Sequence, residues 1–146
     1  MKQNKIISKF LLIICILFSA CSAYAKESVP YIVSGEVVLS SEASEFNAAG
    51  FEFYFLNKSE KTVKKFTLVF FLFDEDGEPI SNGRSNIVIS VEHEIEGNDY
   101  LTACLSLDKY LNEIPEVPYE VDYLYVSKIE YVDGSDWDDP LGMLNF

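Results

Sequence analysis

The stretch that most constrains this chain is residues 51–80, which read FEFYFLNKSEKTVKKFTLVFFLFDEDGEPI. Fully apolar positions alternate with mixed ones over Phe51–Leu56, and a period of two is typical of a β-strand. The run Phe66–Phe73 is largely apolar on both faces, so we expect it in the middle of a sheet, where neither face is left against water. The polar link Asn57–Thr62 supplies a turn, which predicts that the two strands pair with each other. The acidic segment Asp74–Pro79 then ends the second strand.

The same alternation predicts strands in the rest of the chain. The sequence Asp133-Gly134-Ser135 is suited to a hairpin turn, and we expect the following Trp137 and tail to supply a last strand or a flap. Trp137 is bulky enough to plug the core. The other predicted strands are Tyr31–Leu39, Ile87–Ile95, Leu101–Leu107 and Val121–Tyr131.

One segment has a different period. Leu107, Tyr110, Leu111 and Ile114 follow the spacing of one helix face, which predicts one short helix between Ser106 and Pro115. About seven strands spaced by turn signals, with a single short helix, indicate an all-β fold, an antiparallel β-sandwich with Greek-key links. A partly open barrel is the alternative.

The order of motifs along the chain resembles a known family. An apolar strand, N-K-S-x-K-T, a longer aromatic strand and D-E-D-G-E-P follow one another, and D-G-S-x-W occurs at Asp133–Trp137. This order resembles the immunoglobulin-like domains of bacterial envelope proteins that are described by an F-x-L-Y-D consensus. This chain has Phe73 where that consensus has tyrosine. The resemblance implies an immunoglobulin-like sandwich of about seven strands, a place in the cell envelope and no active site.

The amino terminus predicts export. Lys2, Lys5 and Lys9 precede the apolar run Phe10–Phe18, which is too short to span a bilayer and is followed by small residues. This pattern indicates a signal peptide. The sandwich domain is then expected over residues 26–146.

Two cleavage sites remain open. The sequence Phe18-Ser19-Ala20-Cys21 resembles a relaxed lipobox, in which residues 1–20 are removed and Cys21 is acylated. The sequence Ala23-Tyr24-Ala25 suits ordinary signal peptidase, which would remove residues 1–25. The exported protein is therefore expected in the periplasm or cell envelope, either lipid-anchored or soluble.

The exported chain is strongly acidic. Removing the three leader lysines from 11 basic residues leaves eight against 24 acidic ones, a net charge of −16. Such a field repels nucleic acid and anionic lipid headgroups, so neither is an expected partner. The remaining route to a membrane is a lipid anchor on Cys21.

Alternation also predicts an interaction surface. The residues expected to face the core on the central strands include Phe51, Phe53, Phe55, Phe66, Phe70, Tyr123 and Tyr125. If they do, a second apolar set must face outward, with charged residues at its rim. Apolar patches of this kind are uncommon on lone monomers and suggest a protein partner or self-association. The alternative is that the short helix or the carboxyl-terminal tail covers the set. The predicted partner-binding residues are Tyr54, Val69, Phe71, Phe73, Leu124 and Val126.

Asp74, Asp76 and Glu78 have the spacing of a calcium loop, with oxygen ligands at alternate positions. Ser85 stands where an EF-hand has its twelfth-position glutamate, so an ordinary acidic turn is the competing interpretation. A second acidic group could join the site only if both turns lie at the same end of the fold. That group is Asp133, Asp136, Asp138 and Asp139.

The sequence contains no recognisable catalytic constellation, and no cofactor is expected. His93 is the single histidine and is predicted to face away from its neighbouring glutamates. Cys104 is the one cysteine that remains unmodified after either cleavage, so no internal disulfide can form, and we expect it to be buried. The sequence thus favours a non-enzymatic binding or structural module, with a calcium- or carbohydrate-binding β-sandwich domain as the alternative.

Overall fold

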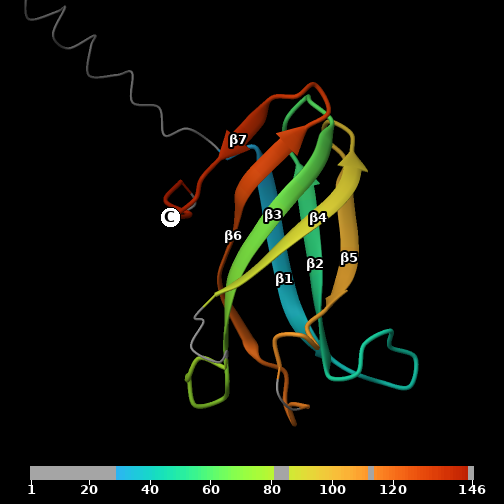
Figure 1. The fold of residues 1–146 in the computed structure, drawn as a ribbon, viewed down its shortest axis with the longest axis vertical. Helices are drawn as coiled ribbons and strands as arrows, with labels where there is room; N and C mark the ends of the chain where they lie inside the picture. The colour runs from blue at the N-terminus through green and yellow to red at the C-terminus, as the bar shows by residue number, and fades with distance from the viewer. Residues whose placement is uncertain (1–28, 81–85, 112–113, 145–146) are drawn as a thin grey trace, which may run out of the picture.

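The computed structural model describes residues 29–80, 86–111 and 114–144, and these contain seven strands and no helix. Two antiparallel sheets are formed, a three-stranded sheet in the order β1-β2-β5 and a four-stranded sheet in the order β4-β3-β6-β7 (Figure 1). The predicted leader, both cleavage sites and Cys21 lie outside the described residues. No helix within those residues is long and apolar enough to cross a membrane. The strands are β1 (Tyr31–Leu39), β2 (Ala49–Asn57), β3 (Val63–Phe73), β4 (Ile87–Ile95), β5 (Tyr100–Ser106), β6 (Glu120–Tyr131) and β7 (Asp136–Asp138).

The two sheets pack face to face through aromatic side chains. Phe51 of β2 stacks on Phe70 of β3 with ring centroids 4.2 Å apart, and Phe55 stacks on Phe66 at 4.1 Å. These rings are almost completely shielded from solvent. Burial of a ring of this size stabilises the fold by roughly 2–3 kcal/mol, so the predicted inward faces of β2 and β3 hold the sheets together.

The prediction that β2 and β3 pair with each other was wrong. β2 pairs with β1 and β5, whereas β3 pairs with β4 and β6. The link between β2 and β3 therefore crosses from one sheet to the other. A polar linker of this length permits either arrangement, and here stacking of the two aromatic faces across the core takes the place of backbone pairing.

Strand β6 contains two irregularities that change which face its side chains occupy. Thr67 pairs with Lys128 and Leu68 pairs with Val126, so Ser127 is an extra residue on β6. Val69 pairs with Tyr125 and Phe71 pairs with Asp122, so β6 has a second extra residue between Tyr125 and Asp122. Each extra residue reverses the alternation of the strand.

The short helix predicted between Ser106 and Pro115 is not found in the described part of that segment. Its first residues form a turn, in which the Tyr110 N–H donates to the Leu107 carbonyl over 2.8 Å. The side chain of Leu107 is fully buried. Residues 112–113 lie outside the described residues.

Trp137 lies in a last strand, β7, as predicted, whereas the described residues of the tail form turns and no strand. Trp137 pairs with Ile129 of β6 and packs edge-on against Tyr31, with ring centroids 5.5 Å apart. Trp137 therefore covers one margin of the core, as its size suggested.

Candidate functional site

The residues predicted to form one interaction patch are divided between two sheets. Tyr54 lies on the outer face of the three-stranded sheet, where its ring stacks on Tyr100 with centroids 5.5 Å apart. Because β2 and β3 belong to different sheets, Tyr54 cannot share a surface with the β3 residues. The three predicted residues of β3 lie together on the outer face of the four-stranded sheet: Val69, Phe71 and Phe73. Phe71 and Phe73 are half-buried, but Val69 is only 5% exposed, so its predicted exposure was wrong.

The outward orientation predicted for Leu124 and Val126 was wrong. Val126 is 0% exposed and belongs to the core, and Leu124 is half-buried against that core. The cause is the extra residue Ser127, which turns the side chains that follow it in the pairing to the opposite face. Tyr125, predicted to face inward, consequently pairs with Val69 on the outer face.

The outer face of the four-stranded sheet carries the one predicted set that stays together, and we call it the aromatic face. At its centre the ring of Tyr123 meets the ring of Phe71 edge-on, with centroids 5.6 Å apart. Tyr123 is 53% exposed and Val88 is 50% exposed. No sequence pattern marks the β6 irregularities, so Tyr123 was not predicted for this face. Val88 was missed because the pairing of β4 with β3, which sets it opposite Val69, was not predicted. The aromatic face consists of Val69, Phe71, Phe73, Val88, Tyr123 and Tyr125.

The backbone presents Tyr123 in an unusual conformation. Its φ is 50°, in the left-handed region that is rare for residues other than glycine, asparagine and aspartate. Its N–H donates to Oδ1 of the neighbouring Asp122 over 2.8 Å, which holds the local turn of the chain. A conformation of this kind costs on the order of 1–3 kcal/mol and is often found at functional sites.

Two segments cover the margins of the aromatic face. Gly142 lies directly on the Tyr125 ring, since a Cβ built there would fall 2.9 Å from it, and the Tyr125 hydroxyl donates to the Pro140 carbonyl over 3.3 Å. Burial, and then the nearby Asp139 charge, raise the pKa of Tyr125. The Tyr110 hydroxyl reaches the Val88 carbonyl at 3.2 Å. The expectation that the tail folds over the patch is therefore true for Tyr125, while the ring of Tyr123 remains half exposed.

The tail itself is fixed by a buried carboxylate. The Asp139 side chain accepts the backbone N–H groups of Met143 at 3.0 Å and Leu144 at 2.9 Å. Asp139 is 5% exposed, and these two hydrogen bonds satisfy its oxygens. The segment that closes over Tyr125 is thus an ordered turn.

Charge is distributed unevenly along this sheet. Asp122 pairs with Phe71 and Glu120 pairs with Phe73, so carboxylates accompany the aromatic rings. The basic side chains of the face lie toward its other end, where Lys65 contacts Glu92 at 3.2 Å and Lys128 contacts two carboxylates. The exposed aromatic centre therefore has an acidic surround.

The acidic turn proposed for calcium uses its first carboxylate to organise its own backbone. Asp74 Oδ1 accepts the N–H groups of Asp76 at 3.0 Å and Glu78 at 2.8 Å, and Gly77 has a φ of 78°. Within the described ranges, no group of three or more acidic, histidine or cysteine side chains is arranged to hold a metal ion. This geometry is that of an aspartate-capped turn.

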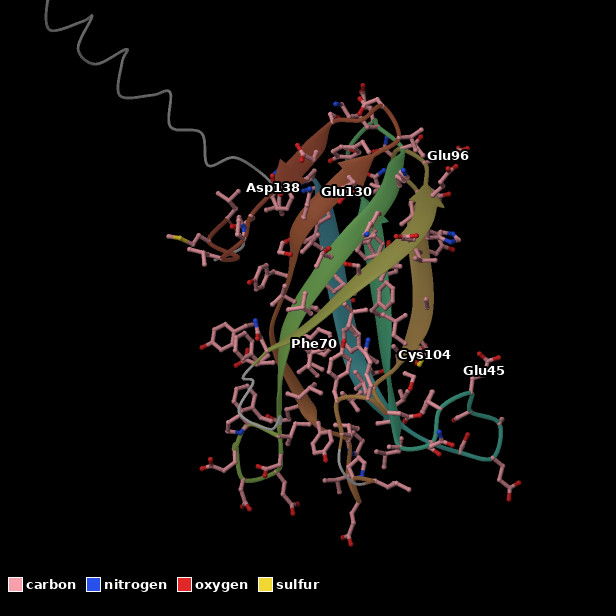
Figure 2. All side chains as sticks on the ribbon, in the orientation of Figure 1. Glu45, Phe70, Glu96, Cys104, Glu130 and Asp138 are labelled. Atoms are coloured by element: carbon pink, nitrogen blue, oxygen red, sulfur yellow. The ribbon has the colours of Figure 1, made fainter. Side chains whose placement is uncertain are left out.

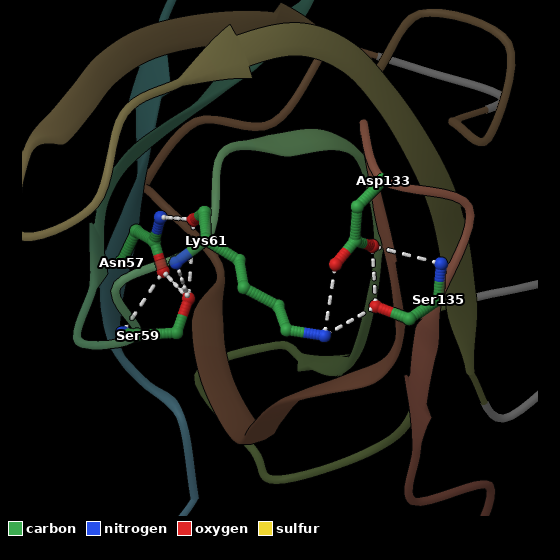
Figure 3. A network of polar contacts seen from close by, with 5 residues as sticks. All are labelled: Asn57, Ser59, Lys61, Asp133 and Ser135. Atoms are coloured by element: carbon green, nitrogen blue, oxygen red, sulfur yellow. Dashed lines mark hydrogen bonds and ion pairs between the residues drawn. The ribbon is translucent and has the colours of Figure 1, made fainter.

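The second acidic group lies at the opposite end of the fold. β3 begins beside Tyr131 and ends beside Glu120, so the turn after β6 and the turn after β3 are separated by the full length of that strand (Figure 1). Asp133 there contacts the Lys61 ammonium at 3.0 Å (Figure 3). Hydrogen bonds from the Ser135 hydroxyl and N–H, and then the Lys61 ammonium, lower the pKa of Asp133 to about 2. The two acidic turns cannot combine in one site.

His93 and Cys104 are both exposed, contrary to the orientations predicted for them. His93 falls in an irregular stretch where Val63 pairs with Ile95 but Lys65 pairs with Glu92, and it lines one surface hollow together with Glu92 and Glu94. Cys104, which Figure 2 labels beside β5, pairs with Glu52 on the outer face of the three-stranded sheet. Partial burial, followed by the charge of Glu52, raises the pKa of its thiol. A raised pKa lowers the thiolate fraction, and a reactive cysteine has the opposite shift.

Comparison with known proteins supports the fold and does not extend to function. No protein-family model matches the sequence, and no curated protein matches it. The X-ray structure of a hypothetical protein from Peptoclostridium difficile 630 is similar, with a TM-score of 0.56 and 11% sequence identity. The similarity covers 77% of this chain and 88% of that one. At this identity the likeness shows that the two chains share a fold.

Proposed function

We propose that this chain is an exported, non-enzymatic, immunoglobulin-like module of a bacterial cell envelope, and that it works by holding another protein. The strand order supports this assignment, because two facing antiparallel sheets whose second and third strands lie in different sheets are typical of immunoglobulin-like sandwiches. The leader sequence and the motif order of the resembled envelope domains support export.

The observation that carries the proposal is the Tyr123–Phe71 pair. The Tyr123 ring is held at the surface by a strained backbone, beside a half-buried phenylalanine and within an acidic surround. Aromatic side chains of this kind are the residues that contribute most binding energy at protein interfaces. The surrounding carboxylates favour a partner that presents apolar side chains flanked by lysine or arginine.

A photo-crosslinking amino acid at position 123, introduced in the producing cell, tests the proposal. Position 102, on the other sheet, is the control, since its side chain is exposed on an outer face that the aromatic face does not share. We expect a discrete protein adduct from position 123 and none of the same mass from position 102. If both positions give the same adducts, or neither gives any, the aromatic face is not the contact surface.

Variants of Tyr123 then separate binding from folding. Tyr123→Gly removes the ring at a backbone position that suits glycine, so the domain should remain folded with an unchanged or higher melting temperature. Loss of an interface aromatic worth about 2 kcal/mol would weaken the identified complex about 30-fold. Tyr123→Phe keeps the ring and serves as the matched control. Equal affinity of all three proteins would remove Tyr123 from the interface.

A second candidate function is carbohydrate binding on the other sheet. The stacked Tyr54 and Tyr100 rings lie beside a shallow hollow of about 300 Å³, whose lining includes Glu36, Glu52 and Thr102. Aromatic faces with adjacent hydroxyl and carboxylate groups suit sugar rings. Affinity electrophoresis in gels containing envelope polysaccharide checks this, with Tyr54→Ala as the variant that should migrate freely.

A further inference from the structure

Strand β5 is an unprotected edge of the three-stranded sheet. It pairs with β2 along one side, and no described strand pairs with its other side. In Figure 1 it forms one lateral margin of the molecule. Its sequence, Tyr100–Ser106, contains no charged residue and no proline, and its register with β2 is regular along its whole length.

The hydrogen-bonding pattern shows which backbone groups point away from the sheet. The Leu107 N–H donates to the Ala49 carbonyl, and the Asn57 N–H donates to the Asp99 carbonyl. In an antiparallel ladder this fixes the odd-numbered residues of β5 as those bonded to β2. The N–H and C=O groups of the even-numbered residues therefore point outward: Tyr100, Thr102, Cys104 and Ser106. Of these groups, the Tyr100 N–H already donates to Oδ1 of Asp99 over 2.8 Å.

The other edges of the two sheets are protected in ways that β5 is not. β4 carries Glu92 and Glu94, and its pairing with β3 is irregular between Glu92 and Ile95. β7 is a three-residue strand with aspartate at both ends. β1 carries Glu36 on its outer face. Charges, irregularities and short length are the usual means by which proteins prevent edge-to-edge pairing. β5 has none of these.

The inward side chains of β5 are also incompletely covered. Leu101 and Leu105 are half-buried, whereas their partners on β2, Phe55 and Phe51, are almost fully shielded. One more strand alongside β5 would cover these leucines. Both the backbone and the apolar face of β5 thus lack a neighbour on the same side.

We propose that β5 is a self-association edge, at which a second copy of this chain adds its own β5 in antiparallel pairing, joining two three-stranded sheets into one. β5 contains no charged residue, so it can meet itself without placing like charges opposite one another, whereas β7 would set Asp136 opposite Asp138. The register that uses the whole strand sets Ala103 opposite Ala103 of the second copy. Thr102 of each copy then exchanges both backbone hydrogen bonds with Cys104 of the other.

Long-range charge opposes this pairing and gives it a recognisable salt dependence. On the outer face of this sheet, Glu52 of β2 lies opposite Cys104 and places a carboxylate beside β5. Across the joined sheet the two β2 strands are three strand spacings apart, about 14 Å, which exceeds the Debye length of about 8 Å at physiological ionic strength. Self-association of this acidic chain should therefore strengthen as salt is added. Binding of a basic partner, in contrast, would weaken as salt is added.

Sedimentation velocity tests the proposal. The protein is taken in the form that its producing cell accumulates and is measured over a range of concentrations at about 0.05 and about 0.5 M salt. We expect a monomer–dimer equilibrium that shifts toward dimer at the higher salt concentration. A monomer at all concentrations up to about 100 μM, an association that weakens with salt, or open-ended aggregation overturns it.

Thr102→Pro is the informative variant, because the N–H at this position points away from β2 and the native ladder does not need it. It should leave the melting temperature within a few degrees and raise the dimer dissociation constant about tenfold or more. Thr102→Val keeps the N–H and should dimerise as the native protein does. If Thr102→Pro is folded and dimerises with unchanged affinity, β5 is not the interface.

Thr102→Cys tests the register independently. It places a thiol opposite Cys104 of the second copy, within the Cα separation that a disulfide allows. Oxidised glutathione should then convert the variant to a covalent dimer on non-reducing gels. Thr102→Cys combined with Cys104→Ser should not form one. Absence of the covalent dimer in the single variant rejects the proposed pairing.

Discussion

The side-chain amide of Asn57, at the end of β2, donates a hydrogen bond to the backbone carbonyl of Ile95, at the end of β4, over 3.2 Å. These strands belong to different sheets. The same nitrogen lies 2.8 Å from the Lys61 carbonyl and 2.9 Å from the Glu96 carbonyl, and Oδ1 accepts the N–H and hydroxyl of Ser59 (Figure 3). Asn57 is 0% exposed. One buried amide thus fixes the crossing between the sheets.

Replacing Asn57 by alanine should destabilise the domain by about 2–3 kcal/mol, because buried carbonyl groups lose their donor and the crossing link loses its centre. Urea unfolding followed by tryptophan fluorescence measures the change through Trp137. Ser59→Ala is the control and should cost about 1 kcal/mol, since it removes one contact to the same amide. Equal losses in the two variants would mean that the amide does not organise the link.

Acid should weaken the Asp133–Lys61–Ser135 contact. The folded pKa of Asp133, about 2, lies below the ordinary value of 3.8. The contact therefore stabilises the fold above the ordinary value, and this contribution is lost as the pH falls through that value toward about 2. The stability difference between the native protein and Asp133→Asn should be largest near pH 7 and shrink between pH 4 and pH 2. Urea titrations at each pH measure it, and a constant difference would contradict the assignment.

The location of the strands follows directly from the sequence, because half-buried strands display their period in the side chains. The predicted limits of Tyr31–Leu39 and Ile87–Ile95 coincide with β1 and β4. The inward phenylalanines of β2 and β3 were also predicted correctly. Alternation identifies a strand and its apolar face, and these account for the core.

The pairing of the strands and the residues of the candidate surface could not be predicted from alternation in the same way. Nothing local distinguishes a link that forms a hairpin from one that crosses between sheets, so Tyr54 was placed on the wrong surface. An extra residue such as Ser127 leaves no mark in hydrophobicity, yet it reverses Tyr125 and Val126. The candidate surface depends on both features. The sequence therefore indicated Phe71 but missed Tyr123.

Calcium should have little effect on this domain. The Asp74 carboxylate is engaged by two backbone N–H groups, and the acidic turns lie at opposite ends of β3. We expect the melting temperature to change by less than about 1 °C between a chelator and millimolar calcium, because a bound ligand in large excess would stabilise by several kcal/mol. A rise of several degrees, absent in Asp74→Asn, would instead establish a calcium site.

Export predicts a shortened mature chain. Intact mass spectrometry of protein extracted from the membrane fraction should show loss of the first 20 or 25 residues. A chain beginning at acylated Cys21 identifies a lipoprotein, and one beginning at Lys26 identifies a soluble exported protein. Retention of Met1 would contradict both cleavage sites.

The loop between β4 and β5 crosses between the sheets at the same end as the link between β2 and β3, and the two segments touch. The Asn98 N–H donates to the Ser59 carbonyl over 3.2 Å, and a Cβ built on Gly97 would lie 2.7 Å from the Glu60 carbonyl oxygen. Backbone atoms cannot move aside as a flexible side chain would. Gly97→Ala should therefore separate the two crossings and destabilise the fold by roughly 2–3 kcal/mol.

The matched control for this contact is Gly77→Ala, at a turn on the opposite end of the fold. Gly77 has a φ of 78° with no atom within 4 Å of a built Cβ, so its substitution introduces backbone strain alone. That strain costs about 1 kcal/mol. Urea unfolding should rank Gly97→Ala well below Gly77→Ala in stability, and hydrogen exchange should show faster opening of the Asn98 amide in the first variant. If the two variants unfold at the same urea concentration, contact between the crossing loops does not limit the stability of the domain.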